Sequence, residues 1–408
     1  MRVLYISYDG MTDPLGQSQV IPYLIELSKS GVEYHVISAE KSNKYQQNKA
    51  GIAKLLDEHD IHWHPLSYTK NPPVLSTLKD ISRIRKTAAR LQEKHSFDIC
   101  HCRSYISAFA GLSLKKKFAV PFLFDMRGFY PDERVDGGLW KLSNPVFRLV
   151  YRYFKQKERA FLKHADHVIS LTEAGKEIMA ERDSWNVSAN DISVIPCSAD
   201  LGHFSPDNPT PESVEALRQE TGIKKNDFVL SYLGSLGTWY MTGEMLDFYA
   251  ELIKHKPDAK FLIISRDDPE IMLKPARAKD IPTENIIVRP ASRQEVPALI
   301  SLSTVSIFFI KPVFSKKASS PTKLAEVLGM GVPVICNAGV GDVDSIVGGN
   351  NAGLVVEKMQ PQHYHDAINN LDDLLQTNPQ KLRQLATDLF SLGMACQTYL
   401  TAYKEMIK

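Results

Sequence analysis

The sequence predicts an α/β protein built from two doubly wound, Rossmann-like domains that face each other across a cleft. Two observations lead to this fold class. Short apolar runs of strand length alternate with amphipathic segments of helix length, which is typical of a mostly parallel sheet with helices on both faces. The alternation occurs twice along the 408 residues, and a polar, proline-rich segment separates the two runs. A chain of this length can bury two separate hydrophobic cores.

The first domain is predicted to span residues 1–200. Apolar runs that we expect to form its strands lie at 2–9, 33–39, 61–67, 97–102, 121–125 and 168–171. Amphipathic segments between these runs are expected to form the helices that cover the sheet. Residues 196–227 then contain four prolines among Asp, Asn, Ser and Thr residues, and this composition predicts a linker.

The second domain is predicted to span residues 201–390. Its expected strands lie at 228–234, 260–265, 286–289, 305–310, 332–336 and 353–356. The last segment, 391–408, follows the final strand, and we expect it to form a helix that crosses back to the first domain.

The composition is that of a globular protein, with 43% hydrophobic and 24% charged residues. A formal net charge of +2 gives no indication of a nucleic-acid partner. The five cysteines are scattered and odd in number, so reduced thiols are expected. No apolar run approaches the length of a membrane span. These features predict a cytoplasmic protein that is either soluble or bound at the inner face of the membrane.

One short helix carries the strongest local signals in the sequence. Ser320 is suited to cap its start, Pro321 fits the first helical position, and Gly331 can take the left-handed conformation that ends it. Lys323 and Glu326 lie one turn apart on the same face. A cation near a helix amino end beside a carboxylate suits a ligand with a diphosphate and a diol, as in a nucleotide sugar. An ordinary surface ion pair at this spacing is the alternative.

Neither predicted domain has the G-x-G-x-x-G turn of a nicotinamide or flavin dehydrogenase after its first strand. Several other segments together with this helix resemble the GT-B glycosyltransferases, specifically the retaining, family-4-like group (glycosyl transferases group 1). The resemblance extends over nearly the whole chain. The segments that carry it are the loop at Gly16, residues 98–101, residues 194–200, residues 232–235, and residues 320–334.

The resemblance implies a donor-binding role for two segments of the second domain and one glycine of the first. In this family a glutamate at the position of Glu326 binds the ribose hydroxyls of the donor, and the segment from Ser320 to Lys323 lies near the diphosphate and sugar. The loop after the first strand of the second domain binds donor phosphates. The expected donor-binding residues are Gly16, Gly234, Ser235, Thr238, Trp239, Arg266, Ser320, Thr322, Lys323 and Glu326.

The chain departs from the family pattern at two places. The first glutamate of the usual Glu-x7-Glu signature would fall at position 318, which is Ala318. The basic pair that many relatives carry just after Gly234 is missing, and Arg266 or Lys323 is expected to supply the cation instead. Trp239 either stacks on the nucleobase or sugar or packs as a core tryptophan.

The first domain carries polar residues after two neighbouring predicted strands, which is where doubly wound sheets bind ligands. His101 and Arg103 end one strand, and Asp125 and Arg127 follow the next. These four residues are predicted to line the reaction centre, although a structural role for His101 is an equal alternative. Asp132 and Glu133 are predicted to contact the acceptor or to act as the base.

The function implied by the resemblance is transfer of a sugar, with retention of anomeric configuration, from a nucleotide sugar to a glycan, a glycolipid or another hydroxyl acceptor. A UDP-sugar is favoured and a GDP-sugar comes next. No cofactor and no metal are expected. The alternatives are a GT-B-fold sugar-nucleotide epimerase or hydrolase, and a non-catalytic glycosyltransferase-like subunit, which Ala318 and the missing basic pair would suit.

The segment 145–167 is relevant to the acceptor. It carries six basic and two acidic residues, and aromatic and aliphatic residues recur among them at helical spacing. Such a basic amphipathic helix is typical of contact with a membrane surface. It can equally pack its apolar stripe on the first domain and leave its charges in solvent.

Overall fold

A computed structural model describes residues 1–72, 74–182 and 185–407, and these form two compact units. Unit 1 comprises Met1–Pro196 and Leu392–Lys408, and unit 2 comprises Cys197–Ser391. The sequence placed the boundary at residue 200, four residues later than the structure does. Lys408, the end of the predicted last helix, lies outside the described residues.

Unit 1 is built on a fully parallel sheet in which apolar strands lie side by side in the order β3-β2-β1-β4-β5-β6-β7. Its strands are β1 (Arg2–Ser7), β2 (Glu33–Glu40), β3 (Ile61–Ser67), β4 (Ile99–Arg103), β5 (Phe122–Asp125), β6 (His167–Ser170) and β7 (Ile192–Val194). Its helices are α1 (Pro14–Gln19), α2 (Ile21–Ser28), α3 (Ser42–Asp57), α4 (Leu75–His95), α5 (Ser104–Phe118), α6 (Tyr130–Asp136), α7 (Pro145–His164), α8 (Glu173–Ala180) and α18 (Leu392–Met406), with a 3-10 turn η2 (Ala189–Asp191).

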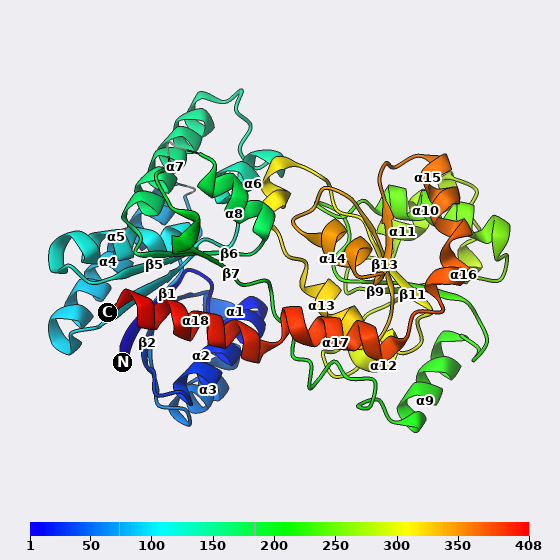
Figure 1. Cartoon of the computed structure of the whole chain (residues 1–408), viewed down its shortest axis with the longest axis horizontal. Helices are drawn as coiled ribbons and strands as arrows, with labels where there is room; N and C mark the ends of the chain where they lie inside the picture. The colour runs from blue at the N-terminus through cyan, green and yellow to red at the C-terminus, as the bar shows by residue number, and fades with distance from the viewer. Residues whose placement is uncertain (73, 183–184, 408) are drawn as a thin grey trace. The chain divides into compact units, whose positions relative to one another are not determined.

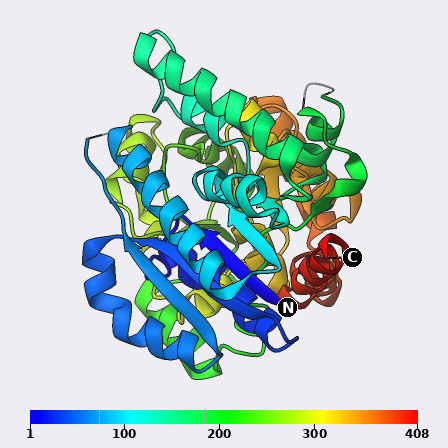
Figure 2. The same ribbon diagram turned by 90° about the vertical axis from the view of Figure 1, so that its left-hand side faces the viewer.

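The C-terminal helix α18 belongs to the core of unit 1. It packs beside α2 (Figure 1). Tyr399 and Tyr403 belong to the buried apolar cluster that β1, β2 and α2 form. Helix α5 packs against α4, α7 and the strands β4 and β5, and α7 also contacts β5. Figure 2 shows the ribbon from the side of this unit. The sheet is therefore covered on both faces, as parallel sheets require.

Unit 2 repeats the arrangement with a parallel sheet in the order β10-β9-β8-β11-β12-β13. Its strands are β8 (Val229–Leu233), β9 (Lys260–Ile264), β10 (Ile286–Arg289), β11 (Val305–Phe308), β12 (Val334–Asn337) and β13 (Gly353–Val356). Its helices are α9 (Pro211–Thr221), α10 (Thr242–His255), α11 (Glu270–Ala278), α12 (Val296–Ile300), α13 (Thr322–Gly329), α14 (Val343–Gly349), α15 (Pro361–Asn369), α16 (Leu371–Leu374) and α17 (Pro379–Phe390), with 3-10 turns η3 (Thr283–Asn285) and η4 (Phe314–Ala318).

The predicted linker at 196–227 is wrong for most of its length, because this segment is part of unit 2. Thr210 caps α9 by accepting a hydrogen bond from the backbone N–H of Ser213 at 3.2 Å, and Pro211 takes the first helical position. The proline that suggested a linker thus starts a helix. Arg383 of α17 donates hydrogen bonds to the carbonyls of Leu201 and Phe204, which fixes the segment before α9.

Candidate functional site

The first turn of α13 places a lysine in a buried aromatic setting. Lys323 is only 8% exposed, and its Nζ lies 3.0 Å from the hydroxyl of Tyr232. The same Nζ lies 4.2 Å from the ring centre of Tyr232 and 3.7 Å from that of Tyr240. Burial lowers the pKa of Lys323 well below its ordinary value. The rings of Tyr232 and Tyr240 thus contact the amine of Lys323, the residue that the sequence analysis assigned to donor binding.

Glu326 lies one turn further along α13 and is half-buried. Burial raises the pKa of this carboxyl above its ordinary value, although Arg293 and Lys323 act in the opposite direction. Among the described residues, no side chain forms a hydrogen bond or ion pair with the carboxylate of Glu326, and Nζ of Lys323 forms its hydrogen bond with Tyr232 instead. The alternative of an ordinary surface ion pair between the two is therefore wrong.

The loop after β8 runs directly over Lys323. A Cβ atom added to Gly234 would lie 2.9 Å from Nζ of Lys323, so the backbone and the amine are in contact. Gly234, Gly237 and Thr238 have φ angles of 125°, 78° and 51°, in the region that favours glycine. A non-glycine residue held at positive φ is typical of a strained functional loop.

Two side chains fix this loop in place. The hydroxyl of Tyr232 donates to the carbonyl of Ser235, and the backbone N–H of Leu236 donates to the carboxylate of Asp267. Beside them, at the carboxyl ends of β8 and β9, is a cavity of about 260 Å³ with apolar walls and a polar rim. It is lined by Leu233, Gly234, Ser235, Ile264, Ser265, Arg266, Asp267, Ala291 and Val296.

Two further residues of the predicted donor site, Arg266 and Trp239, belong to this cavity and this loop. Arg266 donates from Nε to the carbonyl of Ala291 at 2.9 Å and so forms part of the cavity wall. Trp239 is half-buried, and Nζ of Lys316 lies 3.9 Å from its ring centre. The tryptophan is thus not a core residue. Lys316, on η4, is a second cation near the loop that sequence reasoning missed.

The predicted cap of α13 is wrong. The helix begins at Thr322 after Pro321, which carries no side-chain cap. The hydroxyl of Ser320 instead accepts a hydrogen bond from the backbone N–H of Cys197 at 3.2 Å. Gly331 does take the expected left-handed conformation, with φ of 73°.

In unit 1, a buried carboxylate ends β5. Asp125 is fully buried, and its Oδ2 accepts a hydrogen bond from the hydroxyl of Tyr399 at 3.1 Å. Arg103 Nη1 lies 3.8 Å from Oδ2, and Arg127 Nη1 lies 3.8 Å from Oδ1. Burial alone would raise the pKa of Asp125, but Arg127, His101 and Arg103 together lower it below its ordinary value. The group is therefore a carboxylate held between two cations.

His101 is enclosed by the same cluster. Its Nδ1 lies 2.6 Å from the hydroxyl of Tyr403, and its Nε2 lies 3.6 Å from Oδ2 of Asp125. Burial lowers the pKa of this imidazole, which favours its neutral form, although Asp125 acts in the opposite direction. The structure thus brings together the four residues predicted at these strand ends, and it adds two tyrosines of α18 that carry no signal in the sequence.

Asp132 and Glu133 lie on α6. The buried carboxylate of Asp132 accepts hydrogen bonds from the hydroxyl of Tyr151 at 2.8 Å and from Nζ of Lys155 at 2.9 Å. These contacts join α6 to α7. Glu133 is half-buried in the same helix.

Gly16 lies in α1, and its backbone packs against Gly10 and Met11 of the loop that precedes this helix. A Cβ atom here would lie 2.1 Å from the carbonyl oxygen of Gly10, which explains the glycine without a ligand. Glu40, which sequence reasoning missed, holds the loop by accepting hydrogen bonds from the backbone N–H groups of Met11 at 2.7 Å and Thr12 at 3.1 Å.

Comparison with known proteins identifies the family. Residues 16–203 match glycosyltransferase family 4, and residues 213–384 match the glycosyl transferases group 1 domain, so that together the matches cover most of the chain. The chain belongs to the GT-B glycosyltransferases.

Individual relatives are distant. The D-inositol 3-phosphate glycosyltransferase of Paenarthrobacter aurescens is 23% identical over 345 residues, covering 81% of this chain and 77% of that protein. The alpha-monoglucosyldiacylglycerol synthase of Acholeplasma laidlawii is 22% identical over 45% of each chain. The crystal structure of Anabaena HepE in complex with UDP-glucose has a TM-score of 0.66 at 14% identity and covers 98% of each chain, which shows that the fold is shared.

Unit 1 of this glycosyltransferase also has a large apolar pocket. It has a volume of about 680 Å³ and lies among the start of α4, α6 and α7. Its lining is mostly aromatic and aliphatic, with two basic residues. It includes Tyr8, Tyr68, Lys70, Tyr130, Arg134, Trp140, Leu149, Tyr153 and Phe154.

Within residues 1–72, 74–182 and 185–407, none of the helices has the length and apolar character needed to cross a membrane.

Proposed function

We propose that this glycosyltransferase transfers a sugar from a nucleotide sugar to a glycan or lipid-linked hydroxyl acceptor, with retention of anomeric configuration. A UDP-sugar is the favoured donor and a GDP-sugar the next. The observation that carries the proposal is the position of Lys323 against the Gly234 loop, one helical turn before the half-buried carboxylate of Glu326 on α13. Unit 2 would bind the donor and unit 1 the acceptor.

Each part of a nucleotide sugar has a matching feature in unit 2. The Gly234 loop and Lys323 can face the diphosphate, since backbone N–H groups and a cation stabilise phosphate charge. Glu326 can accept hydrogen bonds from both ribose hydroxyls. The cavity of about 260 Å³ beside the loop has apolar walls on which a flat base can stack. The bound UDP-glucose of Anabaena HepE, which shares the fold, supports a uridine donor.

Stabilisation of the leaving diphosphate would be the main catalytic effect. The acceptor oxygen forms a bond to the anomeric carbon, the bond from that carbon to the phosphate oxygen breaks, and the acceptor proton passes to the leaving phosphate. Lys323 and Lys316 are placed near the loop where this negative charge would develop. Because Asp125 is held between Arg103 and Arg127, we assign it to positioning these cations rather than to nucleophilic attack.

The pocket in unit 1 supports a lipid-linked acceptor. Its apolar, aromatic lining suits a hydrocarbon chain, and Lys70 and Arg134 on its wall suit a phosphate. Val146 and Leu149 of α7 are 59% and 70% exposed beside it, and the basic residues of 145–167 share that helix. The glucosyldiacylglycerol synthase relative supports the same acceptor class. We propose that α7 contacts the membrane surface where such an acceptor lies.

The experiment that tests this function measures transfer itself. The protein is incubated with labelled UDP- and GDP-hexoses and with bacterial lipid extract or short oligosaccharides, and the product linkage is read by NMR. We expect labelled sugar in the lipid-extractable fraction from a UDP donor, with the anomeric configuration of the donor kept. Release of free sugar or an epimer without any acceptor would favour the hydrolase or epimerase alternative. Turnover only after addition of a second protein would favour the non-catalytic subunit.

A further inference from the structure

Four imidazoles and one carboxylate gather at the amino ends of β2 and β3 in unit 1. Glu33 and His35 lie on β2, His62 and His64 lie on β3, and His95 is the last residue of α4. His35 and His62 are direct neighbours in the strand register, so their side chains share one face of the sheet. β3 is the edge strand of this sheet.

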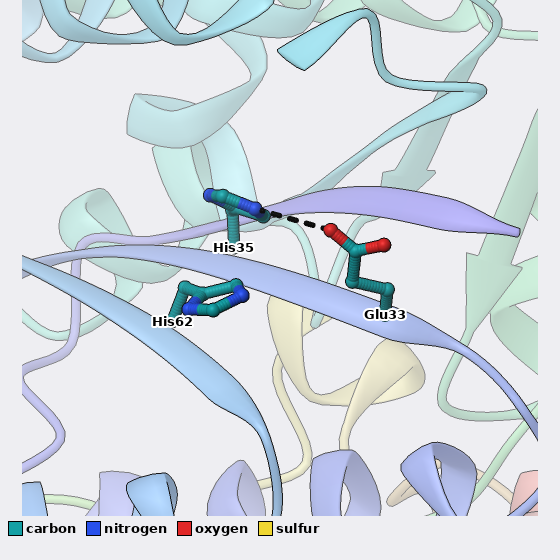
Figure 3. A group of neighbouring side chains, drawn as sticks. All are labelled: Glu33, His35 and His62. Atoms are coloured by element: carbon teal, nitrogen blue, oxygen red, sulfur yellow. Dashed lines mark ion pairs between the residues drawn. The ribbon is translucent and has the colours of Figure 1, made fainter.

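Three of these side chains form a compact set of possible metal ligands. One ligand atom each from Glu33, His35 and His62 lies within 4.8 Å of the others, and Figure 3 shows the two rings and the carboxylate side by side. Nε2 of His35 lies 3.5 Å from Oε1 of Glu33. The ring centres of His35 and His62 are 4.5 Å apart.

The buried Nε2 atom of His35 faces this group and forms no hydrogen bond within the part of the chain that the structure describes. The residue is 3% exposed, and its Nε2 has no hydrogen-bond partner among the described residues. Its Nδ1 lies 3.0 Å from Nε2 of His64, and that contact fixes the ring. A buried polar atom left unsatisfied is uncommon and needs an explanation, and a bound ion is one. A second-sphere contact on the other ring nitrogen is also what metal-binding histidines normally have.

The cluster is not part of the glycosyl-transfer site. The candidate residues of that site in unit 1, such as Arg103 and Asp125, lie at the carboxyl ends of the strands. Glu33, His35 and His62 lie at the amino ends of theirs. The expectation that sugar transfer needs no metal therefore gives no reason against a metal ion at this separate cluster.

We propose that Glu33, His35 and His62 bind a divalent transition-metal ion of the zinc class. Imidazole nitrogens with one carboxylate oxygen are the ligands that Zn²⁺, Co²⁺ and Ni²⁺ prefer, with bonds of about 2.0–2.2 Å to zinc. His62 is exposed and can turn to close the group around an ion. Arg2 contacts Oε1 of Glu33 at 2.9 Å, so the carboxylate would be shared between that guanidinium and the ion. The ion would link the edge strand β3 to β2 through its ligands on both strands.

The test is a calorimetric titration of Zn²⁺ into full-length protein without a histidine tag, after chelation and removal of the chelator. The test variants are His62→Ala and His62→Ala with Glu33→Gln. The control is His255→Ala with His365→Ala, because Glu251, His255 and His365 form the other group with ligand spacing among the described residues. Visible d–d absorption of Co²⁺ reports whether the ion is bound and with which coordination geometry.

We expect one ion per chain, affinity at least about tenfold weaker in His62→Ala, and unchanged affinity in the control. Zinc should raise the melting temperature of the wild type and of the control variant, because an ion that binds only the folded state stabilises it. Absence of zinc binding by the wild type would overturn the proposal. Equal binding by His62→Ala, or loss of binding in the control variant alone, would overturn it as well. Since His62 is exposed, its replacement leaves the fold intact, which circular dichroism checks.

Discussion

A Cβ atom on Gly234 would lie 2.9 Å from Nζ of Lys323, so the loop after β8 and the first turn of α13 are in contact at this glycine. Gly234 also has a φ of 125°, which a side chain rarely tolerates. The glycine is therefore required both by its backbone conformation and by the lysine beside it.

Gly234→Ala is expected to weaken nucleotide binding about tenfold or more, because the strain of a side chain at this φ is of order 1–3 kcal/mol and the lysine must move. Isothermal titration with UDP measures the change. Gly243→Ala is the matched control, since a Cβ there meets no atom within 4 Å. Equal affinity of the two variants would contradict the assignment of this loop to the donor.

The burial of Lys323 leads us to predict that donor binding depends on pH. Only the protonated amine attracts a diphosphate, and burial lowers the pKa of this lysine well below its ordinary value. Affinity for UDP should therefore fall as pH rises through that lowered pKa, at a lower pH than an ordinary surface lysine would give. Lys323→Arg keeps its charge over this range and should flatten the profile. Identical profiles for the two proteins would show that Lys323 does not contact the phosphates.

Much of the fold is predictable from the sequence, because most strands are apolar runs and most helices between them are amphipathic. The short strand β7 (Ile192–Val194) was missed, and α5 is buried over most of its residues rather than amphipathic. β2 begins at Glu33 and β10 spans Ile286–Arg289, in agreement with the periodicity. The segment around Pro211 was predicted wrongly as a linker, because proline is common both in linkers and at the first position of a helix. Ser320 was predicted wrongly as a cap because a tertiary contact with Cys197 uses its hydroxyl.

The site is only partly predictable, for a different physical reason. Lys323 and Glu326 stand out through their helical spacing, and Asp125 through its place after a strand. Tyr232, Tyr240 and Tyr399 carry no local signal, because only the folded chain brings these rings to a lysine or a carboxylate. Glu40 carries no local signal either, because its hydrogen bond from the backbone N–H of Met11 depends on the pairing of β1 with β2.

Asp125→Asn is expected to destabilise the protein by about 3–5 kcal/mol, because it removes the buried negative charge that lies 3.8 Å from both Arg103 and Arg127. The folded-state pKa of Asp125 is lowered, so its contribution is present above the usual aspartate pKa and is lost as pH falls through the lowered value. Urea unfolding at neutral and acidic pH measures both effects. Asp57→Asn, on the exposed end of α3, should change stability by no more than about 0.5 kcal/mol. A similarly small effect of Asp125→Asn would show that the cluster does not depend on this charge.

Leu149→Asp is expected to weaken binding to anionic lipid vesicles about tenfold, because inserting a leucine side chain contributes roughly 1.5–3 kcal/mol. Leu149 is 70% exposed on α7, beside the basic residues of the same helix. Vesicle sedimentation with and without phosphatidylglycerol measures the effect. Leu389→Asp, 37% exposed on α17, is the control and should bind as the wild type does. If both variants sediment like the wild type, α7 does not contact the membrane.

The most direct test of donor binding is a thermal-shift comparison of UDP, GDP, CMP and ADP on the wild type, Glu326→Ala and the exposed control Glu215→Ala. A ligand that binds the folded state raises the melting temperature by mass action. We predict that UDP raises it for the wild type and for Glu215→Ala but not for Glu326→Ala, because the ribose contact is lost. No shift of the wild type with any nucleotide, or an equal shift in Glu326→Ala, would contradict the assignment of α13 to the donor.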